Sequence, residues 1–300
     1  MKSKLYFLPI FLLVFAYSCK SRHGNIDTFV PVFSTYTKDT TGTKLPPEKN
    51  AIFYGVLTPV EICGIFNRLK VPNNAAKLNP TSNRYLYLSS SKTAINTGIY
   101  GVDLGYLKMF DASQQMINYM LTIRDMSNNL GIPDYYITEP IKMIQSDISE
   151  PDTIMALMNK AFNSIENHLR AEGRESSAGL MVMGGWVEAM FISTQLVYDP
   201  AAPDPEVVEK IAEQKYTLTS LLSFMKNYYD DPVVVYYTKK LKFLKNYFDT
   251  FDIYFKQGDL EIDTTKQVLL SSGSEMTVTI ETLNNIREYI SKLRTEMVKP

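Results

Sequence analysis

The chain has 300 residues and a formal net charge of -1, and 45% of its residues are hydrophobic, 21% charged and 12% aromatic. These fractions are typical of a globular protein and exclude wholesale disorder. A net charge near zero gives no general attraction to nucleic acid, so we expect no such partner. With only two histidines and two cysteines, we expect no metal site and no cofactor.

The first nineteen residues have the pattern of a bacterial export signal. Lys2 and Lys4 precede an apolar run, residues 5–15, that is too short for a membrane span of about 20 residues but suits a secretory signal peptide. The next four residues, Ala16-Tyr17-Ser18-Cys19, resemble a lipobox. The resemblance implies that Cys19 becomes the acylated N-terminus and anchors the protein in a membrane, since two or more acyl chains bind stably. An ordinary signal peptide with an incidental cysteine is the alternative.

These features predict three segments. Residues 1–18 form a lipoprotein signal peptide, residues 19–50 an acylated N-terminus with a flexible polar tether, and residues 51–300 a single helical domain. Lys20, rather than an aspartate, follows the lipobox, and this resembles lipoproteins sorted to the outer membrane. We therefore expect an outer-membrane protein, on either the periplasmic face or the cell surface. With Cys19 lipidated, Cys63 has no partner for an intramolecular disulfide.

From residue 51 onward the pattern is helical. Thr58-Pro59 with Glu61 forms a capping box, Asp204-Pro205 and Asp231-Pro232 repeat the cap-proline pattern, and Leu130-Gly131 is a helix stop. Alternating strand patterns occur only at 84–88 and 260–270. The predicted fold is all-α, a multi-helix bundle or an array of antiparallel helices. The predicted helices are 58–70, 96–110, 112–130, 138–148, 151–172, 176–198, 205–229, 232–257 and 274–297.

The predicted helix 232–257 is apolar over a wide arc. One stripe runs from Tyr237 to Phe255 at spacings of three and four, and a second stripe lies about 100° around the helix. This second stripe contains Tyr236, Phe243, Tyr247 and Tyr254. Its tyrosines are candidates for a partner surface or a sugar-binding groove; the alternative is that they pack between two neighbouring helices.

Residues 178–192 are apolar almost all round and predict a central buried helix rather than a membrane span. Their glycines, Gly179, Gly184 and Gly185, would let a neighbouring helix approach closely. Residues 97–110 align with residues 178–191 without gaps, so two repeated halves are an alternative organisation.

Two carboxylates, Asp103 and Glu188, lie in apolar surroundings. A buried carboxylate must be paired, hydrogen-bonded or protonated. The two acids are therefore candidates for ligand contact, or for the acid and base of a hydrolase. The alternative is that each binds a tyrosine hydroxyl or a basic residue of a neighbouring helix, for example Arg124. No motif identifies a catalytic residue.

Two other patterns are compatible with a simple surface role. His168 and Glu172 have helical spacing but make an incomplete metal site. The basic run Lys239-Lys240-Leu241-Lys242 predicts either a solvated face or contact with an anionic lipid or glycan.

The segment from Asn96 to Asp134, together with the lipobox and the tether, resembles uncharacterised all-helical lipoproteins of Bacteroidetes-type bacteria. The run that carries most of the similarity contains Gly98, Tyr100, Asp103, Leu104 and Tyr106. The resemblance implies a helical fold and an envelope location, and it brings no ligand or catalytic residue with it. We expect a lipid-anchored cell-envelope module that binds a protein or glycan partner without catalysis. The alternatives are an envelope hydrolase that uses buried carboxylates, and a small-molecule or glycan carrier with a Tyr-lined pocket.

Overall fold

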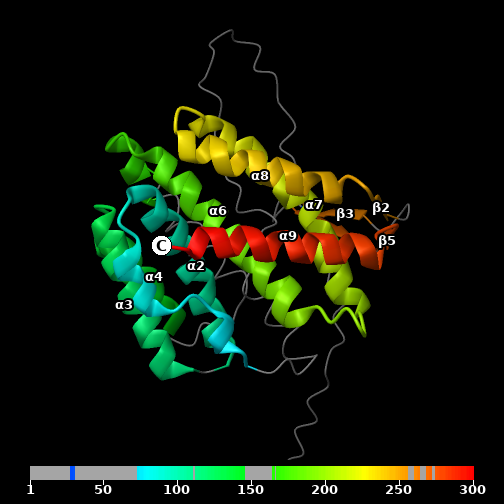
Figure 1. Ribbon diagram of the computed structural model, residues 1–300, viewed down its shortest axis with the longest axis horizontal. Coiled ribbons are helices and arrows are strands. Elements are labelled where there is room, and N and C mark those ends of the chain that lie inside the picture. Colours follow the sequence, from blue (N-terminus) through cyan, green and yellow to red (C-terminus); the bar gives the residue numbers. More distant parts are fainter. Residues whose placement is uncertain are drawn as a thin grey trace, which may run out of the picture.

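The structure is a computed structural model that describes residues 28–30, 73–110, 112–145, 164–165, 167–255, 260–263, 268–271 and 274–300. Packed helices dominate this part of the chain, as Figure 1 shows, and the predicted all-α class is confirmed. The longer helices are α2 (Ser90–Met109), α3 (Ser113–Asn129), α4 (Tyr135–Gln145), α6 (Glu175–Ile192), α7 (Pro205–Met225), α8 (Pro232–Phe248) and α9 (Ile280–Val298). Shorter helical turns are η1 (Ala75–Lys77), η2 (Thr81–Leu86), η3 (Ser193–Val197) and η4 (Lys226–Tyr228).

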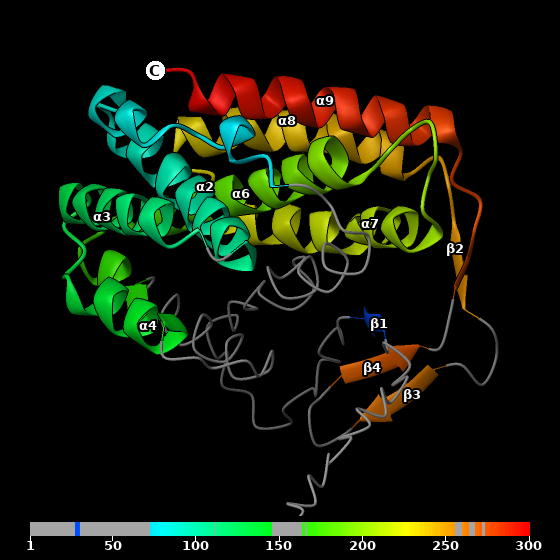
Figure 2. The ribbon, with the colours of Figure 1, turned by 90° about the horizontal axis from the view of Figure 1, so that it is seen from below.

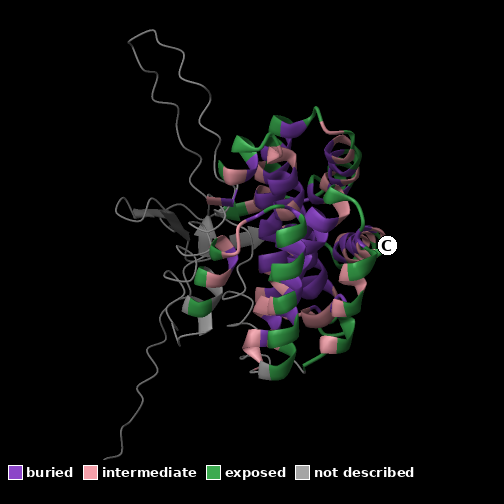
Figure 3. Cartoon of the chain, turned by 90° about the vertical axis from the view of Figure 1, so that its left-hand side faces the viewer, coloured by how far each residue is buried: buried purple, intermediate pink, exposed green. Residues whose placement is uncertain are grey.

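Helix α6 lies at the centre of the bundle and packs against α2, α7, α8 and α9. Helices α8 and α9 lie side by side along one side of the helical part, and α3 packs on α2 and α4 (Figure 2). Figure 3 shows that the buried residues concentrate where the helices face one another. By length and composition, residues 175–197 could cross a membrane, but 72% of the apolar window is buried against the other helices. This helix is therefore the core of the bundle, as its sequence predicts.

Two glycines let α2 and α6 approach closely. A Cβ atom on Gly98 would lie 1.9 Å from the carbonyl oxygen of Met181, and one on Gly184 would lie 2.1 Å from that of Ile95. Only glycine fits at such a backbone contact. The close approach predicted for the glycines of α6 is confirmed, and it brings the following turns of the two helices together.

The helix ends follow the predicted signals. Asp204 and Asp231 each accept hydrogen bonds from the backbone N–H groups two and three residues further on. In both cases a proline occupies the first position of the helix, α7 or α8. After α3, Gly131 adopts a left-handed φ of 64°, and its N–H donates to the carbonyl of Asn128 at 2.8 Å. The glycine stop is thus confirmed.

The strand predicted at 84–88 is wrong, because residues 81–86 form the turn of helix η2. The two long helices predicted at 232–257 and 274–297 also have different bounds in the structure. The helix predicted over 232–257 ends at Phe248, and residues 253–255 form a short strand instead. That strand pairs with residues 274–276, so α9 begins only at Ile280, after its cap Thr279.

Short antiparallel strands accompany the helices in the described residues. The pairs are β2 with β5, and β1 and β3 on either side of β4. The weak strand prediction at 260–270 agrees with β3 and β4. The bounds are β1 (Thr28–Val30), β2 (Ile253–Phe255), β3 (Leu260–Asp263), β4 (Val268–Ser271) and β5 (Ser274–Met276).

Several predictions fall outside the described residues. They are the signal peptide, most of the tether, Cys19, Cys63, the helix at 58–70 and most of the helix at 151–172. The two repeated halves also stay a prediction, although the similar segments, in α2 and α6, pack directly against each other.

Candidate functional site

Three ionisable side chains meet inside the bundle, and we call them the buried cluster: Asp103 of α2, Glu188 of α6 and Arg294 of α9. Asp103 and Glu188 are fully buried, and Arg294 is 8% exposed. Arg294 donates from Nε to Oε2 of Glu188 at 2.8 Å, and from Nη2 to Oε1 at 3.0 Å. This two-bond geometry is the strongest form of a carboxylate–guanidinium pair. The cluster therefore ties the central helix to the C-terminal one.

Asp103 completes the cluster, and its surroundings favour the protonated form of its carboxyl. Burial raises its pKa well above the ordinary value, and the charge and hydrogen bonding of Glu188 raise it further, against the opposing charge of Arg294. Its Oδ2 accepts from the backbone N–H of Asn79 at 3.1 Å, whereas Oδ1 finds no donor among the described residues. A proton on Asp103 lets it donate to Glu188. The buried cluster then holds one negative and one positive charge, which balance.

A layer of polar side chains connects this cluster to the end of α9. Asn79 donates from Nδ2 to the Tyr87 hydroxyl at 3.0 Å and to Oδ1 of Asn96 at 3.1 Å. The last backbone carbonyls of α9 have no partner within the helix. They accept hydrogen bonds from the side chains of Tyr87, Lys92 and Asn96. The carbonyls are those of Glu296, Met297, Val298 and Lys299.

The geometry differs from the one that a hydrolase needs. Two catalytic carboxyls would flank a substrate, about 5–10 Å apart across an open cleft. Here Asp103 and Glu188 adjoin in a closed core, with Glu188 held by Arg294. Arg124 is not their partner: it pairs with Asp134 at 2.8 Å on the surface.

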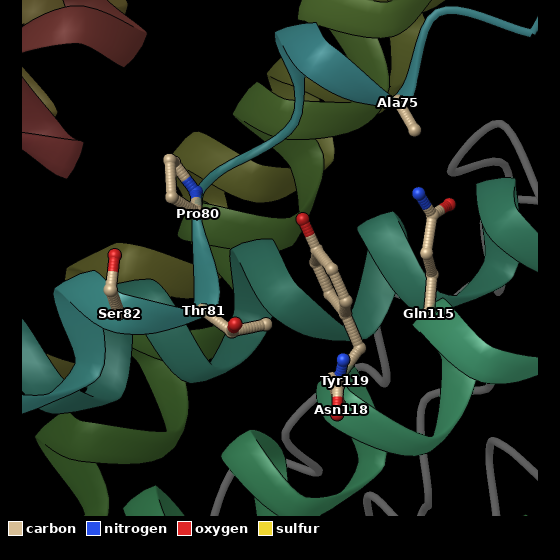
Figure 4. Close-up of a pocket in the computed structure, with 7 residues that line it drawn as sticks. All are labelled: Ala75, Pro80, Thr81, Ser82, Gln115, Asn118 and Tyr119. Carbon is tan, nitrogen blue, oxygen red and sulfur yellow. The ribbon is translucent and has the colours of Figure 1, made fainter.

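A hollow of about 270 Å³ opens on the surface between η1, η2 and α3 (Figure 4). We call it the η2–α3 hollow. In the close-up, the ring of Tyr119 lies between the η2 side and Gln115. Its hydroxyl donates to the carbonyl of Asn79 at 2.9 Å. The backbone N–H of Asn79 in turn donates to Asp103, so this residue connects the inner wall of the hollow to the buried cluster. The lining residues are Ala75, Pro80, Thr81, Ser82, Gln115, Asn118 and Tyr119.

The lining of the hollow is uncharged and mixes polar with apolar side chains. Burial raises the pKa of Tyr119 far above its ordinary value, so its phenol stays neutral at physiological pH. The side chains of Ser82, Gln115 and Asn118 are exposed. Together with Thr81, they offer two hydroxyls and two amides, which can both donate and accept hydrogen bonds. The hollow is therefore suited to a neutral ligand with many hydroxyl groups.

The predicted tyrosine stripe is divided by the structure. Tyr236 is half-exposed and donates to Oε1 of Glu296 at 2.9 Å, while Tyr247 is partly buried beside Tyr289, with ring centroids 6.1 Å apart. Tyr254 lies in β2, beyond the end of α8, so its predicted place on the helical stripe is wrong. The helix ends before it because residues 253–255 pair with β5.

His168 packs against the turn that follows α3 and against the start of α4. Its Nε2 lies 2.9 Å from the carbonyl oxygen of Gly131, and its ring contacts that of Tyr136. Among the described residues, no group of three or more His, Cys, Asp or Glu side chains could hold a metal ion.

Comparisons with protein-family models, with curated proteins and with solved structures gave no match for this chain.

Sequence reasoning identified the two acids but missed their cation and the hollow. Arg294 could have been found, because it follows Ile290 by four residues and so lies on the apolar face of α9. The hollow gave no such signal, since Ser, Thr, Asn and Gln on η2 and α3 have the composition of an ordinary surface.

Proposed function

We propose that the protein is a lipid-anchored, non-catalytic module of the cell envelope that binds an uncharged glycan in the η2–α3 hollow. The envelope address rests on the signal and lipobox of residues 1–19, with Cys19 as the lipidated residue. The choice of a glycan rather than a protein partner rests on the chemistry of the hollow.

The observation that carries the proposal is the neutral lining of the hollow. Sugars present hydroxyl groups that both donate and accept, and the Gln115 and Asn118 amides match this pattern. The ring of Tyr119 is largely buried and closes the inner end of the hollow, so a sugar would contact mainly the side chains at its rim. A volume of about 270 Å³ is near the lower end of ligand pockets. It therefore suits a single sugar ring, with the rest of a chain continuing into solvent.

Binding without catalysis is favoured by the state of the two acids. Glycoside hydrolysis needs a general acid and a second carboxylate that reach the substrate. Asp103 and Glu188 are fully buried, and Arg294 occupies both oxygens of Glu188. Their arrangement is suited to joining helices, and the hydrolase alternative would require other carboxylates.

The test is a saturation-transfer NMR experiment with the full chain and four neutral sugars: glucose, galactose, mannose and N-acetylglucosamine. We expect transfer to at least one sugar, and we expect Gln115→Ala and Asn118→Ala to abolish it. The matched control is Asn128→Ala, which removes an exposed amide from the same helix away from the hollow.

Two results would overturn the proposal. One is the absence of transfer to every sugar, in this full set and in oligosaccharides released from the envelope. The other is transfer that persists unchanged in both hollow variants, which would place the sugar elsewhere.

A further inference from the structure

The outward side of α8 combines lysines with exposed aromatic rings, and we call it the α8 face: Tyr236, Lys239, Lys242 and Phe243. Phe243 is 52% exposed and Tyr236 is 49% exposed, so two large rings lie beside the lysines on one side of the helix. Lys239 and Lys242 are also exposed. The four residues follow one another at helical spacing on the free side of a helix whose other side packs on α7 and α9.

The charges around this face leave it positive. Nearby acids are already paired: Glu296 with Lys240 at 2.8 Å, and Asp249 with Lys245. Lys239 and Lys242 have no acidic partner in the part of the chain that the structure describes. The uncompensated charge of the α8 face is therefore that of these two lysines.

The aromatic part of the face is held in place before any partner binds. Phe243 stacks on Tyr289 of α9 with ring centroids 5.2 Å apart and an interplanar angle of 26°. Tyr289 in turn donates its hydroxyl to the carbonyl of Lys240 at 3.0 Å. The rings thus form a fixed surface across the seam between α8 and α9, and little conformational freedom is lost when something docks there.

We propose that the α8 face docks on an anionic phospholipid bilayer. Lysines near such a surface gain electrostatic free energy, and exposed Phe and Tyr rings bind at the depth of the headgroups. The contact is a second membrane signal, distinct from the acyl chains and from the hollow, and it would orient the bundle on the membrane. It requires neither lipidation of Cys19 nor a glycan.

The experiment measures lysine reactivity in the full chain mixed with vesicles of phosphatidylglycerol and phosphatidylcholine, or of phosphatidylcholine alone. A water-soluble acylating reagent is applied, and each lysine is quantified by mass spectrometry. Because a lysine gains about 1 kcal/mol near an anionic surface, we expect roughly fivefold lower acylation of Lys239 and Lys242 on the anionic vesicles. Lys77 and Lys142, which are exposed elsewhere, serve as internal controls and should not change.

A pair of variants tests the aromatic contribution. Phe243→Ser should reduce the protection of Lys239 and Lys242, whereas Ile117→Ser, which removes a similarly exposed apolar side chain from α3, should leave it intact. Sedimentation of the vesicles reports separately on the anchor, because acyl chains would bind both lipid compositions.

The proposal is overturned if Lys239 and Lys242 react equally on the two kinds of vesicle, or if the protein sediments with neither. Protection of the same lysines by inorganic phosphate without anionic lipid would also contradict it, because the site would then bind a phosphate group rather than a bilayer surface.

Discussion

Arg294 in α9 holds both carboxylate oxygens of Glu188 in α6, at 2.8 and 3.0 Å, across a separation of 106 residues in the chain. Asp103 of α2 adjoins this pair, and burial together with the charge of Glu188 raises the pKa of its carboxyl well above the ordinary value. The three helices thereby meet at one polar contact in the middle of the bundle, in which the charges of Glu188 and Arg294 balance each other.

Removal of the cation should destabilise the fold. Arg294→Met leaves Glu188 charged and without a partner in the core, and we expect the free energy of unfolding to fall by about 3–5 kcal/mol at pH 7. A second substitution, Glu188→Gln, removes the stranded charge, so the double variant should recover more than half of the loss. Urea unfolding followed by circular dichroism measures both. A double variant no more stable than Arg294→Met would contradict the pairing.

Replacement of Asp103 should change the pH dependence of stability. Because the folded-state pKa of Asp103 lies above its unfolded value, the folded protein binds more protons than the unfolded chain between the two values. The contribution of Asp103 is full below its unfolded pKa, near 4, and is lost as the pH rises through the folded pKa. The slope for one proton is at most about 1.4 kcal/mol per pH unit.

Asp103→Asn imitates the neutral acid, since its amide can donate to Glu188 while its oxygen accepts from Asn79. We therefore expect the variant to be at least as stable as the parent at pH 8, with a flatter profile between pH 5 and pH 9. Urea titrations at several pH values provide the measurement. Parallel profiles for the two proteins would show that Asp103 is ionised in the fold.

Replacing two glycines of α2 by alanine should change the stability of the protein in opposite directions. Gly98→Ala places a Cβ 1.9 Å from the Met181 carbonyl oxygen, so α2 and α6 must move apart and stability should fall. Gly101→Ala meets no atom within 4 Å, and it should stabilise the helix by about 0.5–1 kcal/mol. Thermal unfolding of the two variants is the test, and equal melting temperatures would contradict the close approach.

The anchor can be tested in cells. Cys19→Ala removes the residue to which acyl chains would be attached, and we expect the protein to move from the membrane fraction to the soluble fraction. Cys63→Ala is the matched control, because it removes the other cysteine and should leave the protein in the membrane fraction. If Cys19→Ala stays bound after a high-salt wash, the lipobox interpretation is wrong.

Local signals predicted much of the fold, and distant contacts account for what was missed. Asp204, Asp231 and Gly131 mark helix ends through groups within a few residues, so these ends could be predicted. Strand β2 depends on pairing with residues 274–276, about 20 residues away. Because of this pairing, Tyr254 lies in a strand and not in the predicted helix. The partner of Glu188 lies further still along the chain.

The candidate site shows the same division. Asp103 and Glu188 could be recognised in the sequence as acids in apolar surroundings. Burying a charge costs free energy, so an acid in such a segment is expected to have a specific partner. The residues of the η2–α3 hollow are ordinary surface types, and only the packing of α3 against η2 brings Thr81 and Asn118 to one place.

The end of α9 is held by residues far earlier in the chain: Lys92 binds its carbonyls across 204 residues, and Asn96 across 201. Arg294 comes from the same helix, so the buried cluster is complete only when α9 has packed on α6. Contacts between segments so far apart in the chain slow folding, because the loop between them must be closed before they form. For the envelope protein proposed above, slow folding would help to keep the chain unfolded until it has been exported.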